Sequence, residues 1–360
     1  MRNLSFLTFF ALICVAGASA TAEDCGALPA AAAPGSHVML TAASHVAAPV
    51  LTVRSKGAEE VVGGFEGGTV IKADGAFYAF VTEMMAGWST RLALWSSPDG
   101  DHWTRIATLF SSSGDFTGKD RRAGLWAAMP VYDEQRGEWD LFYVAYRAKP
   151  DTPTAWYANY DGEIVRAVSQ TRGKDGFKGP YADAGVILSP GRKSDAWEGL
   201  QGVDSFYPYR VGDEWMGFYG TAHTEVKPVS SWRVGLAAAP ALRGPWRRCS
   251  QLNPSPIETH FIENPVVSRV GDSYLAVYDV DVDAGNSIGY ADSQDGVNWS
   301  QGRRLEIFTD PSFHARTPLA LIDDGHGAYD LFVTAYAPVK NAQGKTVSKG
   351  ALFHLKVKAR

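Results

Sequence analysis

The segment "FIENPVVSRVGDSYLAVYD", residues 261–279, decides the fold because two other parts of the chain repeat its pattern. The copies are "VDSFYPYRVGDEWMGFYG" at 203–220 and "FEGGTVIKADGAFYAFV" at 65–81. Each copy has an acid six residues before a Lys or Arg, then a Gly-containing turn, then a strand rich in aromatic residues. Strand patterns on either side of such a turn are typical of β-hairpins. The chain therefore contains three equivalent predicted hairpins, and the acids that precede them are Glu66, Asp204 and Glu263.

Two further segments repeat the hairpin without the acid. They are "AAMPVYDEQRGEWDLFYVAY" at 127–146 and "ARTPLALIDDGHGAYDLFVTAY" at 315–336. Both align with the first copy when Pro130 and Pro318 are set against Pro265. This alignment predicts Ala128 and Arg316 at the positions that correspond to the acids.

Two signatures recur after the hairpins. S-x-D-G-x-x-W occurs at 97–103 and 293–299, and Gly-Pro-aromatic occurs at 179–181 and 244–246. They mark an outer strand, so the repeating unit has four strands. Five such units begin 53 to 76 residues apart, which predicts an all-β fold: a five-bladed β-propeller with four-stranded blades around a central channel. A β-sandwich would also explain short strands, but it would not explain five repeats.

Three regions are expected along the chain. Residues 1–20 have an early Arg, an apolar stretch and Ala-Ser-Ala, which is the pattern of a cleaved secretory signal. Residues 60–360 form the predicted propeller, whose last unit lacks an outer strand. The N-terminal segment 21–59 is expected to supply that strand through either 37–43 or 49–55. We therefore expect a secreted or periplasmic protein with no membrane attachment after signal cleavage.

Composition narrows the range of partners and metals. The chain has 360 residues, 45% of them hydrophobic, and can bury a large core. Its net charge of −5 with no long basic run argues against a nucleic-acid partner, and no CxxC or HExxH pattern indicates zinc. Signal removal leaves Cys25 and Cys249, for which a single disulfide and two separate thiols are equally compatible with the sequence.

The innermost strand of each blade lines the channel of a propeller, so residues at one register form a ring. The predicted ring holds Glu66, Ala128, Asp204, Glu263 and Arg316. Crowded carboxylates raise one another's pKa, whereas a neighbouring Arg lowers it. Such a spread suits acid/base chemistry, and glycoside hydrolysis uses two carboxyls, about 6.5–9.5 Å apart for inversion and about 5–5.5 Å for retention.

On these segments the chain resembles the five-bladed propeller glycoside hydrolases, most closely family 43, with families 32 and 117 as neighbours. The resemblance covers roughly residues 60–358. "IENPVVSRVGDSYLAVY" resembles the segment of the general acid, and "GVDSFYPYRVGDEWMGFYG" resembles that of the middle Asp. It implies that Glu263 protonates the leaving oxygen, that Asp204 orients Glu263 and tunes its pKa, and that Glu66 activates water, which gives inversion.

One departure from the family lies at the first acid. The family has Asp there, often followed by Pro, whereas this chain has Glu66-Gly67-Gly68. The longer side chain shifts the base, and the two glycines are expected to let the backbone approach the ligand closely. The departure leaves inversion and retention both open.

Five residues are candidates for substrate binding. Arg316 matches a substrate clamp of the family, with a structural salt bridge as the alternative. His314 lies two residues earlier on the same strand face and is expected to help hold a calcium ion or water, or to be a structural His. His223 is expected to contact sugar hydroxyls, and Trp126 and Phe206 to stack on a sugar face. No cofactor is required, and a structural calcium remains an open alternative.

The sequence supports three functions. The first is an exported glycosidase of the arabinofuranosidase or xylosidase type that acts on oligosaccharides or polysaccharides. The second is a non-catalytic carbohydrate-binding propeller. The third is a family 32-type hydrolase of fructans or sucrose.

Overall fold

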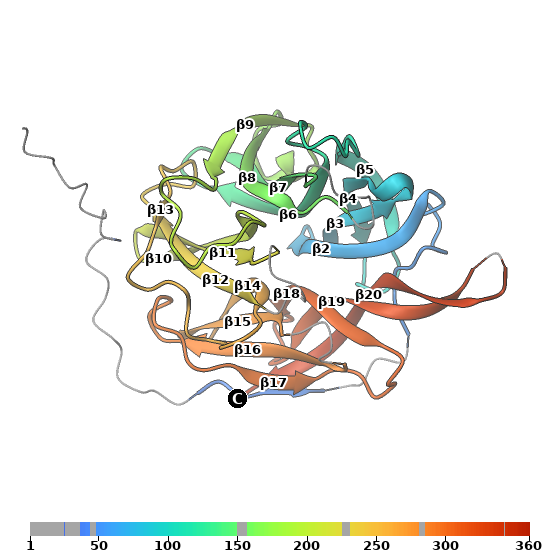
Figure 1. Ribbon diagram of the computed structural model, residues 1–360. Helices are drawn as coiled ribbons and strands as arrows, with labels where there is room; N and C mark the ends of the chain where they lie inside the picture. The colour runs from blue at the N-terminus through green and yellow to red at the C-terminus, as the bar shows by residue number, and fades with distance from the viewer. Residues whose placement is uncertain are drawn as a thin grey trace, which may run out of the picture.

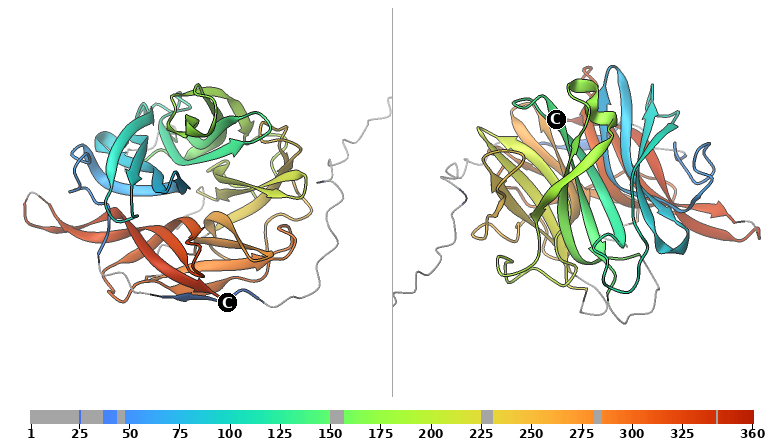
Figure 2. Two further views of the ribbon diagram at one scale, coloured as in Figure 1. Left: turned by 180° about the vertical axis from the view of Figure 1, so that it is seen from behind. Right: turned by 90° about the horizontal axis from the view of Figure 1, so that it is seen from above.

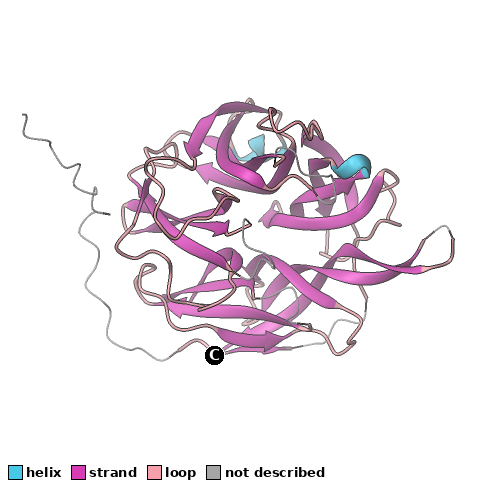
Figure 3. Cartoon of the chain, in the orientation of Figure 1, coloured by secondary structure: helices cyan, strands magenta, loops and turns pink. Residues whose placement is uncertain are grey.

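The computed structural model describes residues 25, 37–43, 48–149, 157–224, 231–280, 285–341 and 343–360. Five four-stranded antiparallel sheets surround a common axis (Figure 1), and nearly all of the regular structure is strand (Figure 3). The predicted all-β five-bladed propeller is confirmed. The predicted signal sequence lies outside the described residues, and within them no helix has the length and apolar character needed to cross a bilayer.

Each of the first four blades begins with its innermost strand and adds the others outward in chain order. The first two blades are β2 (Val61–Ala73), β3 (Ala76–Met85), β4 (Thr90–Ser97) and β5 (Thr104–Ser111), then β6 (Gly124–Asp133), β7 (Glu138–Arg147), β8 (Tyr160–Ser169) and β9 (Tyr181–Leu188). The next two are β10 (Asp204–Val211), β11 (Glu214–Ala222), β12 (Trp232–Ala239) and β13 (Arg247–Arg248), then β14 (Glu263–Val270), β15 (Ser273–Asp279), β16 (Ser287–Ser293) and β17 (Arg303–Glu306). Two short 3-10 helices, η1 (Ala86–Trp88) and η2 (Lys174–Lys178), lie in connections.

The fifth blade joins the two ends of the chain. It contains β18 (His314–Asp323), β19 (Tyr329–Lys340) and β20 (Thr346–Ala359), and its outer strand is β1 (Leu40–Ala42). β1 pairs antiparallel with β20, with Leu40 opposite Ala359. The segment 37–43 thus supplies the strand that closes the ring, while the segment 49–55 contributes an isolated bridge from Leu51 to Leu352. Figure 2 shows the closed ring from behind and from above.

The basic residue of the repeat lies at the opposite end of each hairpin from the acid. It stacks on the aromatic side chain directly across the strand pair, a cation–π contact that fixes the hairpin end. The basic residue is therefore structural. The pairs and their separations are Lys72 over Phe77 at 5.2 Å, Arg210 over Trp215 at 5.2 Å and Arg269 over Tyr274 at 4.2 Å.

A disulfide joins Cys25 to Cys249, which lie 224 residues apart in the sequence. Both cysteines are buried, and Cys249 directly follows the outer strand of the third blade. The bond therefore ties the N-terminal part of the chain, which also supplies β1 of the fifth blade, to the third blade. Of the two alternatives left open by the sequence, the structure contains the disulfide.

Replacing Cys25 by Ser is expected to lower the free energy of unfolding by about 2–5 kcal/mol, because the cross-link closes a long loop in the unfolded chain. Denaturant titration with and without a reductant measures the effect. Cys249→Ser and the double variant should match the single variant, since each breaks the same bond. If a reductant lowered the free energy of unfolding of the double variant further, loss of the disulfide would not explain the effect.

Candidate active site

A β-bulge directly follows the ring position in each of the first four blades. At this point the pairing of the innermost strand slips by one residue, and the bulged residue has a positive φ. Bulges change the direction in which neighbouring side chains point. The side chain before each bulge therefore does not follow the in–out alternation of the strand after it. The residues before the bulges are Glu66, Trp126, Asp204 and Glu263, and the bulged residues are Gly67 (65°), Ala127 (54°), Ser205 (40°) and Asn264 (51°).

The prediction that Ala128 belongs to this ring is wrong, because Trp126 occupies the position. Trp126 and Glu263 both precede the slip in pairing, whereas Ala128 lies beyond it and is fully buried. The alignment through Pro130 caused the error, since Pro130 lies four residues after its ring position and Pro265 only two. In the fifth blade the pairing slips between Ala315 and Pro318, and Arg316 lies within this interval.

Arg316 draws the first and fourth blades' acids together. Its Nη2 lies 2.8 Å from Oε1 of Glu66 and 3.7 Å from Oε2 of Glu263, and its Nη1 lies 2.9 Å from Oδ2 of Asp279. Because both glutamate oxygens lie near the same nitrogen, at 2.8 and 3.7 Å, they are separated by at most about 6.5 Å. The side chains of Glu66 and Glu263 are each 13% exposed, so both acids remain accessible at the site.

Asp204 and Glu263 lie close enough for each to influence the pKa of the other. Burial raises the pKa of Glu263 well above its ordinary value, and the Asp204 charge raises it further, against the opposing effect of Arg316. Burial also raises the pKa of Asp204, but the Tyr146 hydroxyl and the Ser205 backbone N–H donate hydrogen bonds to its carboxylate and favour the ionised form. Burial and the Asp204 charge therefore favour the protonated form of Glu263.

Glu66 is surrounded by donors. Arg316 Nη2 donates to its Oε1 at 2.8 Å, and the Tyr336 hydroxyl donates to its Oε2 at 3.0 Å. The Glu66 charge, together with burial, raises the pKa of Tyr336, so that tyrosine stays neutral and keeps donating. Glu66 thus accepts hydrogen bonds through both of its oxygens, while the raised pKa of Glu263 favours its protonated form.

Three residues of this cluster were not predicted from the sequence: Tyr146, Asp279 and Tyr336. Asp279 pairs directly with Glu263 across the β14–β15 hairpin. The register of the predicted hairpin would therefore have placed Asp279 beside Glu263. Tyr146 and Tyr336 end the similar sequences "YVAY" and "VTAY" in β7 and β19, and each lies opposite the residue two before its ring position. A comparison of second strands would have found both.

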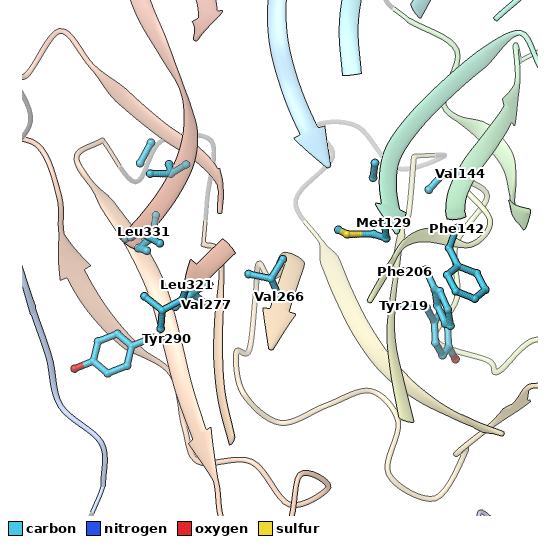
Figure 4. Packing of buried hydrophobic residues seen from close by; sticks show 14 of the residues in the cluster. Met129, Phe142, Val144, Phe206, Tyr219, Val266, Val277, Tyr290, Leu321 and Leu331 are labelled. Atoms are coloured by element: carbon cyan, nitrogen blue, oxygen red, sulfur yellow. The ribbon is translucent and has the colours of Figure 1, made fainter. Parts of the chain in front are cut away.

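The prediction that Phe206 stacks on a sugar is wrong. Its side chain is 1% exposed and packs against Phe142 of the second blade, with ring centroids 5.3 Å apart, and against Trp246 at 4.9 Å. Figure 4 shows Phe206 beside Phe142 in the core. The bulge at Ser205 places Asp204 in the ring, and the next side chain then enters the packing between blades. Trp126, by contrast, is partly exposed.

The glycines after Glu66 have a different role from the one expected. A Cβ on Gly68 would lie 1.8 Å from the carbonyl oxygen of Phe80 on the neighbouring strand, and its φ is 119°. Gly68 is therefore required by the β2–β3 pairing. Gly67 is the bulged residue, with space around its Cβ position but with a left-handed φ.

The two candidate histidines lie outside the carboxylate cluster. His223 follows β11 and its Nε2 lies 2.9 Å from the Trp197 carbonyl oxygen. His314 is exposed as the first residue of β18, opposite Tyr336. Within the described part of the chain, no group of three or more His, Cys, Asp or Glu side chains is arranged to hold a metal ion.

The fold is a five-bladed propeller that is also found in solved glycoside hydrolases. A family 117 glycoside hydrolase of the marine bacterium Zobellia galactanivorans superposes with a TM-score of 0.57 at 13% identity, covering 89% of this chain and 90% of that one. An exo-β-1,3-galactanase of Clostridium thermocellum gives 0.56 at 14% identity, covering 89% and 62%. A thermostable family 43 glycoside hydrolase gives 0.53 at 12%, covering 83% and 93%.

These likenesses confirm the predicted resemblance to families 43 and 117. At 12 to 14% identity they establish a shared fold. No protein-family profile and no curated protein sequence matches the chain.

Proposed function

We propose that the chain is an exported glycoside hydrolase that cleaves oligosaccharides with inversion, in the manner of an arabinofuranosidase or xylosidase. The observation that carries this proposal is the convergence of two accessible glutamates on Arg316: Glu66 accepts hydrogen bonds from Arg316 and Tyr336, and Glu263, whose pKa is raised by burial, lies beside the same guanidinium. The fold shared with glycoside hydrolases supports it. The disulfide between Cys25 and Cys249 is in keeping with export to an oxidising compartment.

The reaction follows from the roles of the three acids. Glu263 donates its proton to the glycosidic oxygen as the bond to the anomeric carbon breaks, and the charge of Asp204 helps to keep Glu263 protonated beforehand. Glu66 accepts a proton from the attacking water on the opposite face of the sugar ring. Positive charge develops on the sugar in the transition state, and the surrounding acidic side chains stabilise it. Arg316 lies beside both glutamates and orients Glu66.

A substrate panel tests the proposal. Aryl glycosides of arabinofuranose, xylose and galactose, together with fructans and agar oligosaccharides, are incubated with the mature chain, and released sugar is measured. Turnover of arabinofuranosides or xylosides supports the proposal, and turnover of fructans alone would indicate the family 32-type activity. Binding without turnover of any member would overturn it in favour of the carbohydrate-binding propeller.

The activity is expected to extend to higher pH than an ordinary glutamic acid would allow. Glu263 must be protonated to act, and its pKa is raised, so kcat/KM falls only as the pH rises through that elevated value. The profile of kcat/KM against pH measures this basic limb. Asp279→Asn, which removes one of the charges that raise the pKa of Glu263, should move the limb to lower pH. A basic limb near pH 4.5 in the unchanged protein would contradict the assignment.

A further inference from the structure

A pocket adjoins the carboxylate cluster between the first and fifth blades. Its volume is about 290 Å³, and its walls come from β2, the end of β3, η1, and the part of the β19–β20 hairpin that projects from the ring (Figure 1). Tyr336 lines this pocket, and its hydroxyl donates to Glu66 at 3.0 Å. The pocket is close to the lower limit of about 300 Å³ for small-molecule sites, which is the scale of one sugar ring.

The hydrogen bonds of Glu66 place the pocket relative to the cleaved bond. Glu66 contacts Tyr336 through Oε2 and Arg316 through Oε1, and Arg316 continues to Glu263. The pocket therefore adjoins the cluster through Tyr336 on the side of Glu66. In the proposed reaction Glu263 protonates the leaving group and therefore lies on the leaving-group side of the cleaved glycosidic bond. A sugar in the pocket, on the side of Glu66, then belongs to the non-leaving part of the substrate.

Two aromatic side chains of the pocket, Tyr157 and Trp88, extend a row of aromatic contacts that begins at Trp126. Trp126 packs edge-to-face on Tyr157 with ring centroids 5.6 Å apart, and Tyr157 packs in the same way on Trp88 at 5.3 Å. Trp88 and the preceding Gly87 both have left-handed φ values, 61° and 68°. A bulky residue seldom adopts this conformation, which costs free energy and is found mostly where function requires it. The strained turn presents an aromatic surface to the pocket.

The charge on the pocket wall is positive. Lys349 lines it, the Ser348 backbone and hydroxyl lie next along β20, and no Asp or Glu belongs to the lining. Lys349 is half-buried, and no hydrogen bond or ion pair joins its side chain to another described residue. A lysine at the wall of a pocket that contains no acid favours an anion there.

We propose that this pocket is a subsite for a sugar ring that carries an anionic group, a carboxylate or a sulfate, on the non-leaving side of the cleaved bond. The proposal rests on the proposed function for the side of the bond, while the anion preference rests on the pocket itself. Trp88 and Tyr157 contact the ring, and Lys349 binds the anionic group. The substrate would then be a uronic-acid-containing or sulfated oligosaccharide.

Binding of matched monosaccharides tests the proposal without any need for turnover. NMR titration compares glucuronate with glucose, and galactose 6-sulfate with galactose, at low salt. At least one anionic sugar is expected to bind roughly tenfold more tightly than its neutral counterpart, and the two pairs distinguish a carboxylate from a sulfate site. Equal affinities within both pairs would overturn the proposal.

Two variants with the same change in charge identify the cation. Lys349→Gln is expected to abolish the anion preference, while Lys345→Gln, in the same hairpin but outside the pocket, should leave it unchanged. Trp88→Gly relieves the strained φ and is expected to weaken all four sugars alike. Retention of the preference in Lys349→Gln would overturn the proposal. Anionic sugars that bind while no glycoside is cleaved would refute the proposed function alone, and cleavage without any anion preference would refute this subsite alone.

Discussion

Glu263→Gln is expected to lower kcat by about 10²- to 10⁴-fold on glycosides with poor leaving groups. Gln preserves the shape of the side chain but has no proton to give to the glycosidic oxygen. The loss should shrink towards nothing for dinitrophenyl glycosides, because such leaving groups depart without protonation. Steady-state kinetics over a series of aryl glycosides with leaving groups of different pKa measures this dependence.

The control for this variant is Glu306→Gln, which makes the same change at an exposed position on β17. It should behave as the unchanged protein does for every leaving group. Sugar binding should persist in Glu263→Gln, since the shape of the side chain is unchanged. A uniform loss for all leaving groups would mean that Glu263 is not the acid.

Glu66→Ala is expected to produce a loss of similar size, about 10²- to 10⁴-fold, but independent of the leaving group. Glu66 accepts hydrogen bonds from Arg316 and Tyr336, and its removal leaves the attacking water without a base. Azide needs no deprotonation and should restore part of the rate by attacking the anomeric carbon in the space that the side chain vacates. Initial rates with and without azide measure the rescue.

The stereochemistry of the product completes the test of Glu66. Proton NMR of the first-formed sugar should show the inverted anomer in the unchanged protein, because Glu66 acts through water. A retained anomer, together with a covalent glycosyl adduct on Glu66, would show that this residue is the nucleophile instead. Tyr336→Phe, which removes one donor to Glu66 and no acid, should retain much of the activity.

The repeated hairpin predicted most of this fold because each copy has a similar sequence pattern and forms the same strand–turn–strand unit. An acid, a turn with Gly and an aromatic strand recur at fixed spacing, and five repeats allow few architectures. The acids of three blades were placed correctly at one register, and Arg316 was predicted to join them from the fifth. These predictions required only the spacing of residues within the repeated hairpins.

The errors arose where one extra residue changes which side chain faces the axis. A bulge after the ring position removes the simple alternation of a strand, so Trp126 took the place predicted for Ala128, and Phe206 entered the core. Prolines proved poor markers of register, because Pro130 and Pro265 lie at different distances from their bulges. The hydrogen-bonding partners Tyr146 and Tyr336 come from second strands, whose residues meet the acids only through tertiary packing.

The most direct test of the account is the titration of the Glu263 carboxyl itself. Carbon-13 NMR of protein labelled at the glutamate δ-carbon, with the signal assigned through Glu263→Gln, follows its protonation with pH. The account predicts a midpoint well above the ordinary 4.5, with Asp204→Asn lowering it. A midpoint at or below 4.5, unmoved by Asp204→Asn, would show that the two carboxyls do not share a site and would contradict the proposed catalytic cluster.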